Sequence, residues 1–448
     1  MTPSVNIDDL KVGMFVHLDL GWWAHPFALS SFLITSADQI ATIRSLGLKR
    51  LRWSPEKSQL DDPAQPATVE GAEAAALAPP DPATAAALAI ANAAGAPPAE
   101  PAPADPASLA RARHRARLAA QRQAERLCQA QVAEARAAWQ QAGQCLEAAP
   151  QQARQIAEGL ARAVTDKLMT PDELCVRVLA DEGGEAQARH ALNVMIVSLM
   201  VGRVCGLAEA EMQDLGLGAL MHDIGKLALP PRHRLPFHGA SADDLAAYQN
   251  HVQLGVAQGK RMGLPAGVLQ LLAQHHELAD GSGFPQKLPL VSQCRGARIL
   301  ALVNRYDNLC NPATPAPGMT PHEALAALFA QSRSKFDSAV LQSFIRMMGV
   351  YPPGSVVQLT DERFATVVSV NSVRPLKPRV LVADLSIPPE EALLVDLDSR
   401  PDLGIRRSLK PPQLPGAVRD YLAPAPRMVY YFEPAVQVPA DGDLALAA

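Results

Sequence analysis

Histidine and aspartate side chains are concentrated in the middle of this 448-residue sequence. The chain has eleven histidines, and seven of them fall between residues 190 and 276. The five that lie within or beside segments of helical periodicity are His190, His222, His251, His275 and His276. Two carboxylates accompany them: Asp223 directly follows His222, and Asp307 lies in the later segment "LALVNRYDNL". Each histidine alone is more commonly structural than a ligand, so the interpretation depends on the whole set.

A mixed set of imidazoles and carboxylates predicts a metal centre, because these ligands suit Fe, Mn or Zn. Five imidazoles and two carboxylates exceed the needs of one tetrahedral ion and match two ions, with Asp223 the natural bridge. Two ions about 3.5–4 Å apart can activate a water and clamp a phosphate oxygen, as in-line phosphodiester hydrolysis requires. Neighbouring helical residues point about 100° apart, so His275 and His276 can face different metals or the phosphate.

Two neighbouring features could assist this chemistry. Lys226 follows His222 by one turn and could stabilise charge that develops on the phosphate; the alternative is a helix-end salt bridge. The loop "HHELADGSGFP" takes its shape from the backbone preferences of Gly281, Gly283 and Pro285. We expect the ring of Phe284 to pack against a ring of the substrate or against the base of its own loop.

Composition excludes several classes of function. The net charge of −4 and the pI near 6.3 argue against general DNA binding. The N-terminus lacks a signal-peptide pattern, and no apolar run approaches twenty residues, so we expect no membrane span and a cytoplasmic location. Six cysteines are scattered without a CxxC pair, which fits a reducing compartment and argues against a thiolate zinc site.

Compositional changes divide the chain into five predicted regions. We expect a small α+β domain at 1–57, a disordered Ala/Pro-rich linker at 58–108, a connecting helix at 109–150, a helical catalytic domain at 151–350, and a β-rich extension with a loosely packed Pro-rich tail at 351–448. In the first region "VGMFVHLDL" and "KRLRW" indicate strands, and "SADQIATIRSLGL" indicates a helix capped by Ser36. Almost no strand pattern is visible between 151 and 350.

The motifs, taken in order, resemble the HD-GYP subgroup of the HD metal-dependent phosphohydrolases. The resemblance covers roughly 170–350 and rests on "RHALNVMIVSLMVGRVCGL", "LGLGALMHDIGKLALP", "NHVQLG", "HHELADGSGFP" and "ILALVNRYDNL". The N-terminal segments resemble the uncharacterised domain that often precedes HD-GYP. The resemblance implies hydrolysis of the bacterial second messenger cyclic di-GMP to pGpG or GMP at a bi- or trinuclear Fe or Mn centre. The ligands it implies are His190, His222, Asp223, His251, His275, His276 and Asp307, with Lys226 assisting and Asp223 and Lys226 as the catalytic residues.

The sequence departs from that pattern at three places. The GYP triplet is Gly283, Phe284 and Pro285, which keeps the ring and lacks the hydroxyl. The position that carries a third-metal glutamate in some relatives is Ala186, with Glu185 one residue out of phase, so we expect two metals. The segment "NLCNPATPAPGMTPHEAL" lacks the basic residues that grip phosphates in many relatives, and Arg305 could substitute for them.

Three functions are consistent with the sequence. The leading hypothesis is a cytoplasmic cyclic di-GMP phosphodiesterase with a binuclear Fe or Mn centre. The second is a catalytically weak cyclic di-GMP receptor or scaffold that binds diguanylate cyclase domains, which the altered loop would favour. The third is an HD hydrolase of another nucleotide. A homodimer is compatible with each.

Overall fold

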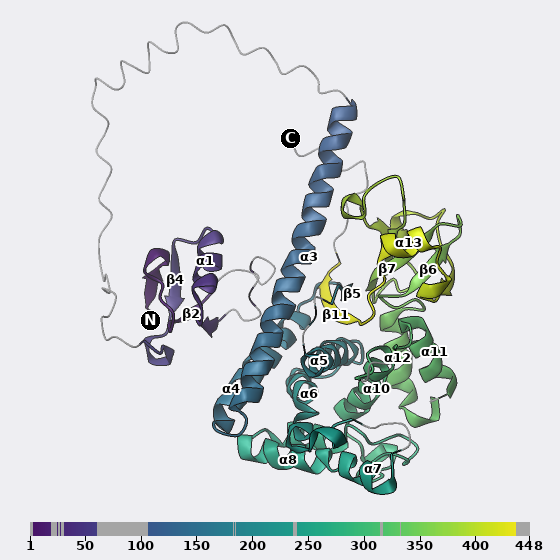
Figure 1. Cartoon of the computed structure of the whole chain (residues 1–448). Helices are drawn as coiled ribbons and strands as arrows, with labels where there is room; N and C mark the ends of the chain where they lie inside the picture. The colour runs from purple at the N-terminus through teal and green to yellow at the C-terminus, as the bar shows by residue number, and fades with distance from the viewer. Residues whose placement is uncertain are drawn as a thin grey trace, which may run out of the picture. The chain divides into compact units, whose positions relative to one another are not determined.

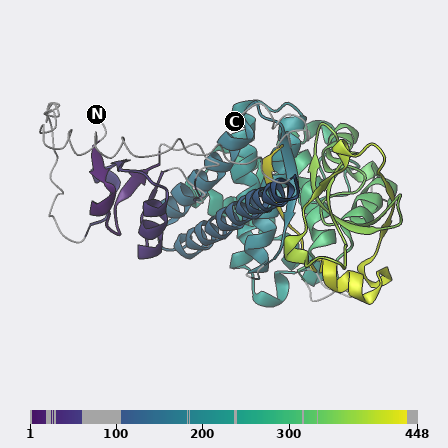
Figure 2. The same ribbon diagram turned by 90° about the horizontal axis from the view of Figure 1, so that it is seen from above.

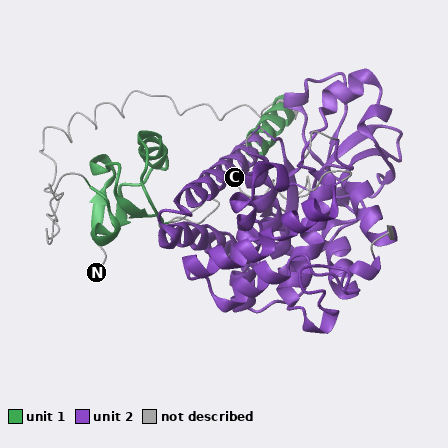
Figure 3. Ribbon diagram, turned by 60° about the horizontal axis from the view of Figure 1, so that its bottom comes forward, with its two compact units in different colours: residues 1–24, 30–121 green, residues 25–29, 122–448 purple. Residues whose placement is uncertain are grey.

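The computed structural model describes residues 3–18, 25, 27, 31–60, 106–181, 183, 185–235, 240–313, 317–331 and 333–435 (Figure 1). The chain divides into two compact units, one of residues 1–24 and 30–121 and the other of residues 25–29 and 122–448 (Figure 3). Most of the predicted linker, 61–105, and the last residues of the predicted tail, 436–448, lie outside the described residues. None of the described helices is both long and apolar enough to cross a membrane.

The N-terminal unit contains a small antiparallel sheet with the strand order β1-β4-β2-β3. Its strands are β1 (Ser4–Asn6), β2 (Phe15–His17), β3 (Ser31–Leu33) and β4 (Arg50–Trp53), with the helix α1 (Ala37–Ser45) and the short 3-10 turns η1 (Ile7–Asp9) and η3 (Pro55–Lys57). Alternation on β4 buries Leu51 and Trp53. Ser36 caps α1 by accepting a hydrogen bond from the Gln39 backbone N–H, so the strands and the capped helix expected from the sequence are confirmed.

Helices make up most of the second unit. A forty-residue helix, α3 (Pro106–Cys145), leads into it. It is followed by α4 (Pro150–Leu168), α5 (Ala186–Val204), α6 (Glu209–Met221), α7 (Ala242–Gln249), α8 (His251–Met262), α9 (Ala266–Gln274), α10 (Arg295–Cys310), α11 (Pro321–Gln331) and α12 (Ser338–Met348). Short 3-10 segments η4 (Ile224–Ala228), η5 (Pro231–His233), η6 (Leu290–Ser292) and η7 (Arg333–Lys335) connect them. Helix α5 is apolar around most of its circumference because α6, α10, α12 and a strand all pack on it.

A seven-stranded antiparallel sheet lies beside the helices, and its later strands gather at one side of them (Figure 2). The strands are β5 (Leu174–Leu179), β6 (Val356–Leu359), β7 (Phe364–Asn371), β8 (Arg379–Val382), β9 (Val395–Asp396), β10 (Ile405–Leu409) and β11 (Val429–Pro434). Helix α13 (Gly416–Leu422) and the 3-10 turns η8 (Pro389–Glu391), η9 (Leu397–Ser399) and η10 (Pro411–Gln413) complete this region. The order is β10-β6-β7-β5-β11, and β8 pairs with β7 and β9.

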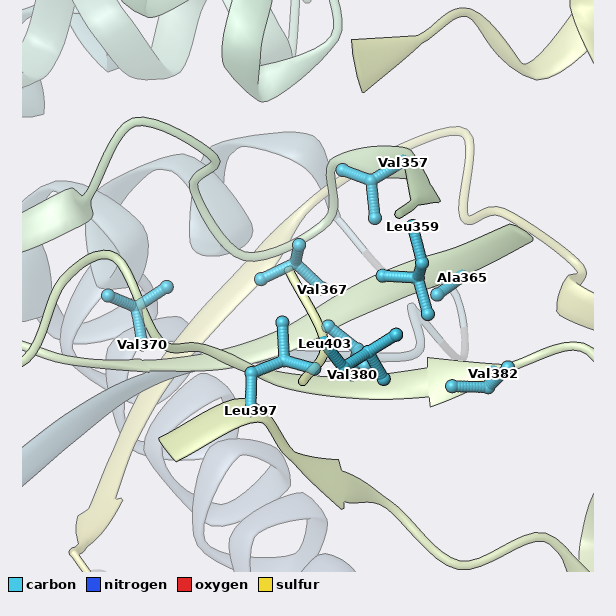
Figure 4. Close-up of a cluster of buried hydrophobic side chains, with 9 residues drawn as sticks. All are labelled: Val357, Leu359, Ala365, Val367, Val370, Val380, Val382, Leu397 and Leu403. Atoms are coloured by element: carbon cyan, nitrogen blue, oxygen red, sulfur yellow. The ribbon is translucent and has the colours of Figure 1, made fainter. Parts of the chain in front are cut away.

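The C-terminal strands enclose an aliphatic core of their own (Figure 4). The buried side chains that form it are Val357, Leu359, Ala365, Val367, Val370, Val380, Val382, Leu397 and Leu403. Val367 and Val370 of the long strand β7 belong to this cluster. The predicted fold class, a mainly helical domain with a small α+β domain before it and a β-rich extension after it, is confirmed.

Two expectations about strands are wrong. Residues 151–350 contain a strand, β5, which pairs along its whole length with β11 in the predicted loose tail. Strand β5 was hidden because "LCVRVL" is buried on both faces, so its sequence shows no alternation. Strand β11 is the run "VYYFEP", and the prolines around it dominated the composition from which a loose tail was expected. Its first five residues are buried.

One close backbone contact explains a glycine in the "HDIGK" motif. Segment η4 packs against the first turn of α8. A Cβ on Gly225 would lie 1.9 Å from the His251 carbonyl oxygen and 2.4 Å from the Gly255 nitrogen. Only glycine therefore allows η4 and α8 to approach this closely.

The exchange Gly225→Ala should lower the free energy of unfolding by at least about 1–3 kcal/mol, because η4 and α8 must separate. Gly255→Ala is the matched control, since a Cβ there meets its nearest neighbour, the Gly225 nitrogen, at an ordinary 3.5 Å. In the middle of a helix that alanine should be neutral or stabilise by up to about 1 kcal/mol. Urea unfolding followed by circular dichroism measures both, and equal effects of the two substitutions would contradict the packing argument.

Candidate metal centre

Helix ends bring the predicted ligands together. His190 lies in the second turn of α5, and His222 and Asp223 lie where α6 ends and η4 begins. His251 is the first residue of α8. His275 and His276 directly follow α9. Backbone segments that end at the same place allow six polar side chains to converge inside an otherwise apolar helical domain.

Three of the imidazoles are oriented by the same local hydrogen bond. The Nδ1–H groups of His222, His251 and His275 donate to backbone carbonyls three residues earlier, at 2.7, 2.6 and 2.8 Å respectively. Donation through Nδ1 leaves Nε2 without a proton and directs its lone pair towards the cluster. Metal-ligating histidines in proteins are commonly held in this way.

The ligand atoms form two sets that share Asp223. One set is His190, His222 and Asp223, and the other is Asp223, His251, His275 and His276; within each set the atoms lie within 4.8 Å of one another. Asp223 Oδ2 lies 3.6 Å from His190 Nε2 and 3.4 Å from His222 Nε2. Asp223 Oδ1 lies 3.6 Å from His251 Nε2 and 3.9 Å from His275 Nε2. Each carboxylate oxygen therefore faces a different set.

The arrangement fits cations placed between the side chains. Nε2 atoms face each other at 3.2 Å between His190 and His222 and at 3.3 Å between His251 and His275. Two bare lone pairs at that distance repel unless a cation lies between them. Asp223 Oδ1 is buried and has no hydrogen-bond donor among the described residues, as expected for an oxygen reserved for a metal. The cluster can bind metal.

Burial keeps the three histidines of the second set neutral. It lowers the pKa of His251 from 6.5 to about 4 and holds the pKa values of His275 and His276 well below the ordinary value. The neighbouring imidazoles reinforce this shift by mutual repulsion, while Asp223 opposes it. Neutral imidazole is the form that ligates metals. Because burial disfavours protonation of these histidines, it keeps them able to bind metal.

Asp223 stays ionised although it is buried. Burial alone would raise the pKa of Asp223, but Lys226, His222 and His190 hold it well below its usual range. Lys226 Nζ lies 2.6 Å from Asp223 Oδ2. The pKa of Lys226 is raised, because Asp223 and Tyr248 outweigh the effect of burial. Lys226 therefore forms a salt bridge, the alternative role expected for it, and its partner is Asp223, the carboxylate that the two sets share.

Asp307 lies at the edge of the cluster and belongs to neither set. Its Oδ2 accepts a hydrogen bond of 2.6 Å from His190 Nδ1, on the side of the ring that faces away from His222. Like the three backbone-bonded histidines, His190 thus presents a bare Nε2. The ligand role of Asp307 stays a prediction; the geometry ties Asp307 to the His190 side of the centre.

The glycine-rich loop packs directly on the cluster. The Phe284 ring stacks on His276 with centroids 4.4 Å apart, and the Phe284 N–H donates to the His276 carbonyl at 3.1 Å. A Cβ on Gly283 would lie 2.5 Å from that same carbonyl oxygen. The buried carboxylate of Glu277, to which the sequence assigned no role, accepts backbone N–H bonds from Gln286 and Leu288 and so fixes the loop. Of the two packing partners expected for Phe284, the base of its own loop is the one present.

A cavity of about 600 Å³ opens beside His275 and His276. Its walls include Phe284 and Gly283 of the loop, Tyr248, and the polar side chains Asn304 and Asn308 of α10. Three cationic side chains line it, Lys226, Arg305 and Lys335, and no carboxylate is among the lining residues. Arg305 was expected here from the sequence. Lys335 was missed; its only signal was the basic cluster "SRSKFD", which carried no motif.

A second cavity of about 60 Å³ reaches His190 and Asp223 from another side. Ala186 and Trp139 contribute to its largely apolar lining. Asp223 is the only carboxylate among the lining residues, so the alanine at position 186 leaves no acidic side chain there. The expectation of two metals over three stays a prediction.

Comparisons with known proteins agree with this geometry. Residues 3–157 match a domain of unknown function (DUF3391), and residues 173–340 match the HD domain family. The chain carries an HD domain. The HD domain contains both histidine sets, the shared aspartate and every residue that lines the cavity of about 600 Å³. It also contains the residues that line the small cavity, apart from Trp139.

Characterised relatives include enzymes that act on cyclic dinucleotides. A cyclic di-GMP phosphodiesterase of Pseudomonas aeruginosa is 28% identical over 396 residues, which cover 85% of each chain. The cyclic di-GMP phosphodiesterase response regulator RpfG of Xanthomonas campestris is 29% identical over 153 residues, 34% of this chain and 40% of that protein. A 3'3'-cGAMP-specific phosphodiesterase of Vibrio cholerae is 28% identical over 165 residues, 35% of this chain and 31% of that protein.

Among solved structures, an HDG"Y"P protein from Bdellovibrio bacteriovorus aligns with 76% of this chain and 97% of its own, at 14% identity and a TM-score of 0.39.

The lowered histidine pKa values predict a pH-dependent stability of the metal-free protein. Between pH 6.5 and about 4 the unfolded chain protonates His251 and the folded chain does not. The free energy of unfolding should therefore fall as the pH is lowered through this range, by up to about 1.4 kcal/mol per pH unit for each such histidine. Urea midpoints of chelator-treated protein at pH 7, 6 and 5 measure the slope. His251→Gln should reduce it, and a flat profile in the unmodified protein would contradict the burial argument.

Proposed function

We propose that this protein is a metal-dependent phosphodiesterase that hydrolyses cyclic di-GMP to pGpG, to GMP or to both. The observation that carries the proposal is the shared aspartate: the two oxygens of Asp223 face separate histidine sets. His275 and His276 of one set also line the cavity that has three cationic side chains. Carboxylate-bridged sites of this kind suit in-line attack on a phosphodiester. The relatives named above act on phosphodiesters of cyclic dinucleotides and support the same reaction class.

The proposed ligands divide between the two sets, and Fe or Mn suits their nitrogen and oxygen atoms. His190 and His222 would hold one ion, and His251, His275 and His276 would hold the other. Asp223 would serve both, with Asp307 supporting the His190 side. Bound metals would supply Lewis-acid activation of water and of the phosphate.

The protein's own groups prepare this chemistry. The Nδ1 hydrogen bonds of His222, His251 and His275 fix the orientation of the rings. Lys226 keeps Asp223 anionic and presents a positive charge at the cavity wall, where charge develops on the phosphate.

The positively charged lining of the cavity complements a substrate with two negative charges. Cyclic di-GMP has two phosphodiester groups, one for the metal centre and one for other cations. Arg305 and Lys335 line the cavity and could neutralise the second phosphate, in place of the basic segment that follows Asp307 in many relatives. Phe284 closes the cavity at the histidine pair and offers an apolar face to a guanine.

The receptor hypothesis is less well supported. A protein that only binds the dinucleotide needs cations in its cavity but has no need for five imidazoles around a shared carboxylate, four of them oriented by hydrogen bonds through Nδ1. The proposal includes a cytoplasmic location, where a bacterial second messenger acts. Contacts with diguanylate cyclase domains and a homodimer stay predictions.

A direct test combines metal analysis with product analysis. Protein purified anaerobically under reducing conditions should contain about two equivalents of Fe or Mn, and chromatography should show cyclic di-GMP converted to pGpG or GMP. Asp223→Asn, which keeps the shape and removes the charge, should lose most of the metal and at least about 100-fold of the turnover, with unchanged helical circular dichroism. Asp243→Ala on the exposed face of α7 is the matched control and should change neither.

Each alternative has its own outcome in this assay. Full metal in Asp223→Asn would refute the bridging assignment. Tight binding of cyclic di-GMP without turnover in the metal-loaded protein would favour the receptor. Faster turnover of 3'3'-cGAMP than of cyclic di-GMP would reassign the substrate within the same reaction class.

Phe284 provides a separate prediction. Because its ring already stacks on His276, Phe284→Tyr should change the turnover of cyclic di-GMP by less than about threefold, a barrier change under about 0.7 kcal/mol. Phe284→Leu keeps apolar bulk without the stack, and Phe284→Ala removes both. These two should raise KM or lower turnover by more than threefold, with the alanine variant the weaker enzyme. A large gain from tyrosine would mean that the missing hydroxyl limits catalysis.

A further inference from the structure

Two asparagine side chains hold the inner oxygen of Asp307. Asn193 on α5 and Asn311, just after α10, each donate from Nδ2 to Asp307 Oδ1 at 2.8 Å. All three side chains are buried. With Oδ1 occupied by two donors, Oδ2 is left to face His190 Nδ1 at 2.6 Å.

The same two asparagines bind the backbone at the start of β11. Their Nδ2 groups also donate to the Met428 carbonyl, at 2.9 Å from Asn193 and 3.0 Å from Asn311. Their Oδ1 atoms accept backbone N–H bonds in return, Asn193 from Tyr430 at 2.9 Å and Asn311 from Met428 at 2.7 Å. Each amide uses both its donor and its acceptor groups, which fixes its orientation without ambiguity.

This arrangement solves an electrostatic problem. The Met428 carbonyl oxygen and Asp307 Oδ1 are both acceptors in a buried space, and neither could remain there without donors. The two amide NH₂ groups supply donors to both at once. Removing either asparagine leaves a carboxylate oxygen and a carbonyl oxygen each short of one donor, so Asp307 is held less firmly.

The strand that anchors the asparagines is itself firmly held. Strand β11 pairs with β5 along all six residues. Tyr430 Oη lies 3.1 Å from Tyr306 Oη on α10. Glu433 forms a buried ion pair of 2.7 Å with Arg177 on β5. A strand fixed at both ends provides a stable reference for the asparagine pair.

We propose that Asn193 and Asn311 are positioning residues for Asp307, and that the backbone of residues 428–430 is a structural part of the metal centre. The inference rests on the proposed metal-dependent function. Its consequence is local: the two asparagines act on the His190 side, while His251 and His275 on the other side have their own backbone hydrogen bonds. Loss of either asparagine should therefore weaken the binding of the ion on the His190 side and leave the binding of the other ion unchanged.

The test is a metal titration of the full-length, metal-free protein. Calorimetry with Mn²⁺ should resolve two sites in the unmodified protein. In Asn193→Ala and in Asn311→Ala, one site should weaken about 10- to 100-fold, the usual effect of losing a residue that orients a metal ligand, and the other should change by less than about threefold. Thermal unfolding of the metal-free variants reports whether each one folds.

Two controls separate positioning from general damage. Asn371 at the end of β7 also donates from Nδ2 to a carboxylate, that of Glu173 at 3.1 Å, but away from the centre; Asn371→Ala should leave both sites unchanged. Asp243→Ala on the exposed face of α7 lies outside the two asparagines and the ligand sets, and it too should retain both affinities. If an alanine variant does not fold, Asn311→Ser carries the test, since its hydroxyl can keep one of the bonds.

The outcomes are distinct. Unchanged affinity at both sites in a folded Asn193 or Asn311 variant would overturn the inference, as would equal weakening of both sites. Absence of metal binding in the unmodified protein would instead refute the proposed function on which the inference rests. Selective loss of one site, with normal binding in Asn371→Ala, supports it.

Discussion

A single ionised carboxylate in a buried position organises the centre. Asp223 can stay charged there because Lys226 lies 2.6 Å from one of its oxygens. The helices that supply these groups must all end at this point, and η4 can approach α8 so closely only because residue 225 is glycine. Three features therefore position the groups around Asp223. They are the close approach of η4 to α8, the backbone carbonyls that accept hydrogen bonds from the histidine rings, and the salt bridge of Lys226.

The two halves of the centre are supported differently. The imidazoles of His251 and His275 are oriented by the backbone carbonyls of Tyr248 and Leu272, each only three residues earlier in the sequence. His190 instead depends on Asp307, and Asp307 on two asparagines bonded to a strand near the end of the chain. Local support follows from the helix itself, whereas long-range support requires the whole tertiary structure.

This difference also determined what could be predicted. The sequence predicted the ligand set because it combines histidines beside helical segments with an HD pair and a late aspartate. The shared role of Asp223 followed from counting the ligands against the needs of two ions. Strand β5 could not be recognised, since burial on both faces removes the alternation that marks a strand. Lys335 and the asparagines were invisible for another reason: their partners are distant in sequence and belong to no motif, so only the fold brings them to the site.

The pairing of β11 with β5 has a consequence for biosynthesis. Asn311 and Met428 are separated by 117 residues, so the ribosome makes every histidine and aspartate of the centre well before it makes the strand. At about 5–20 residues per second, the interval is roughly 6–23 s. During that time β5 has an unpaired edge and Asp307 lacks the backbone anchor of its two asparagines. Maturation of the proposed metal centre is therefore tied to the synthesis of β11. A chain released before this strand would have every candidate ligand, but its His190 side would lack the backbone anchor of the asparagines.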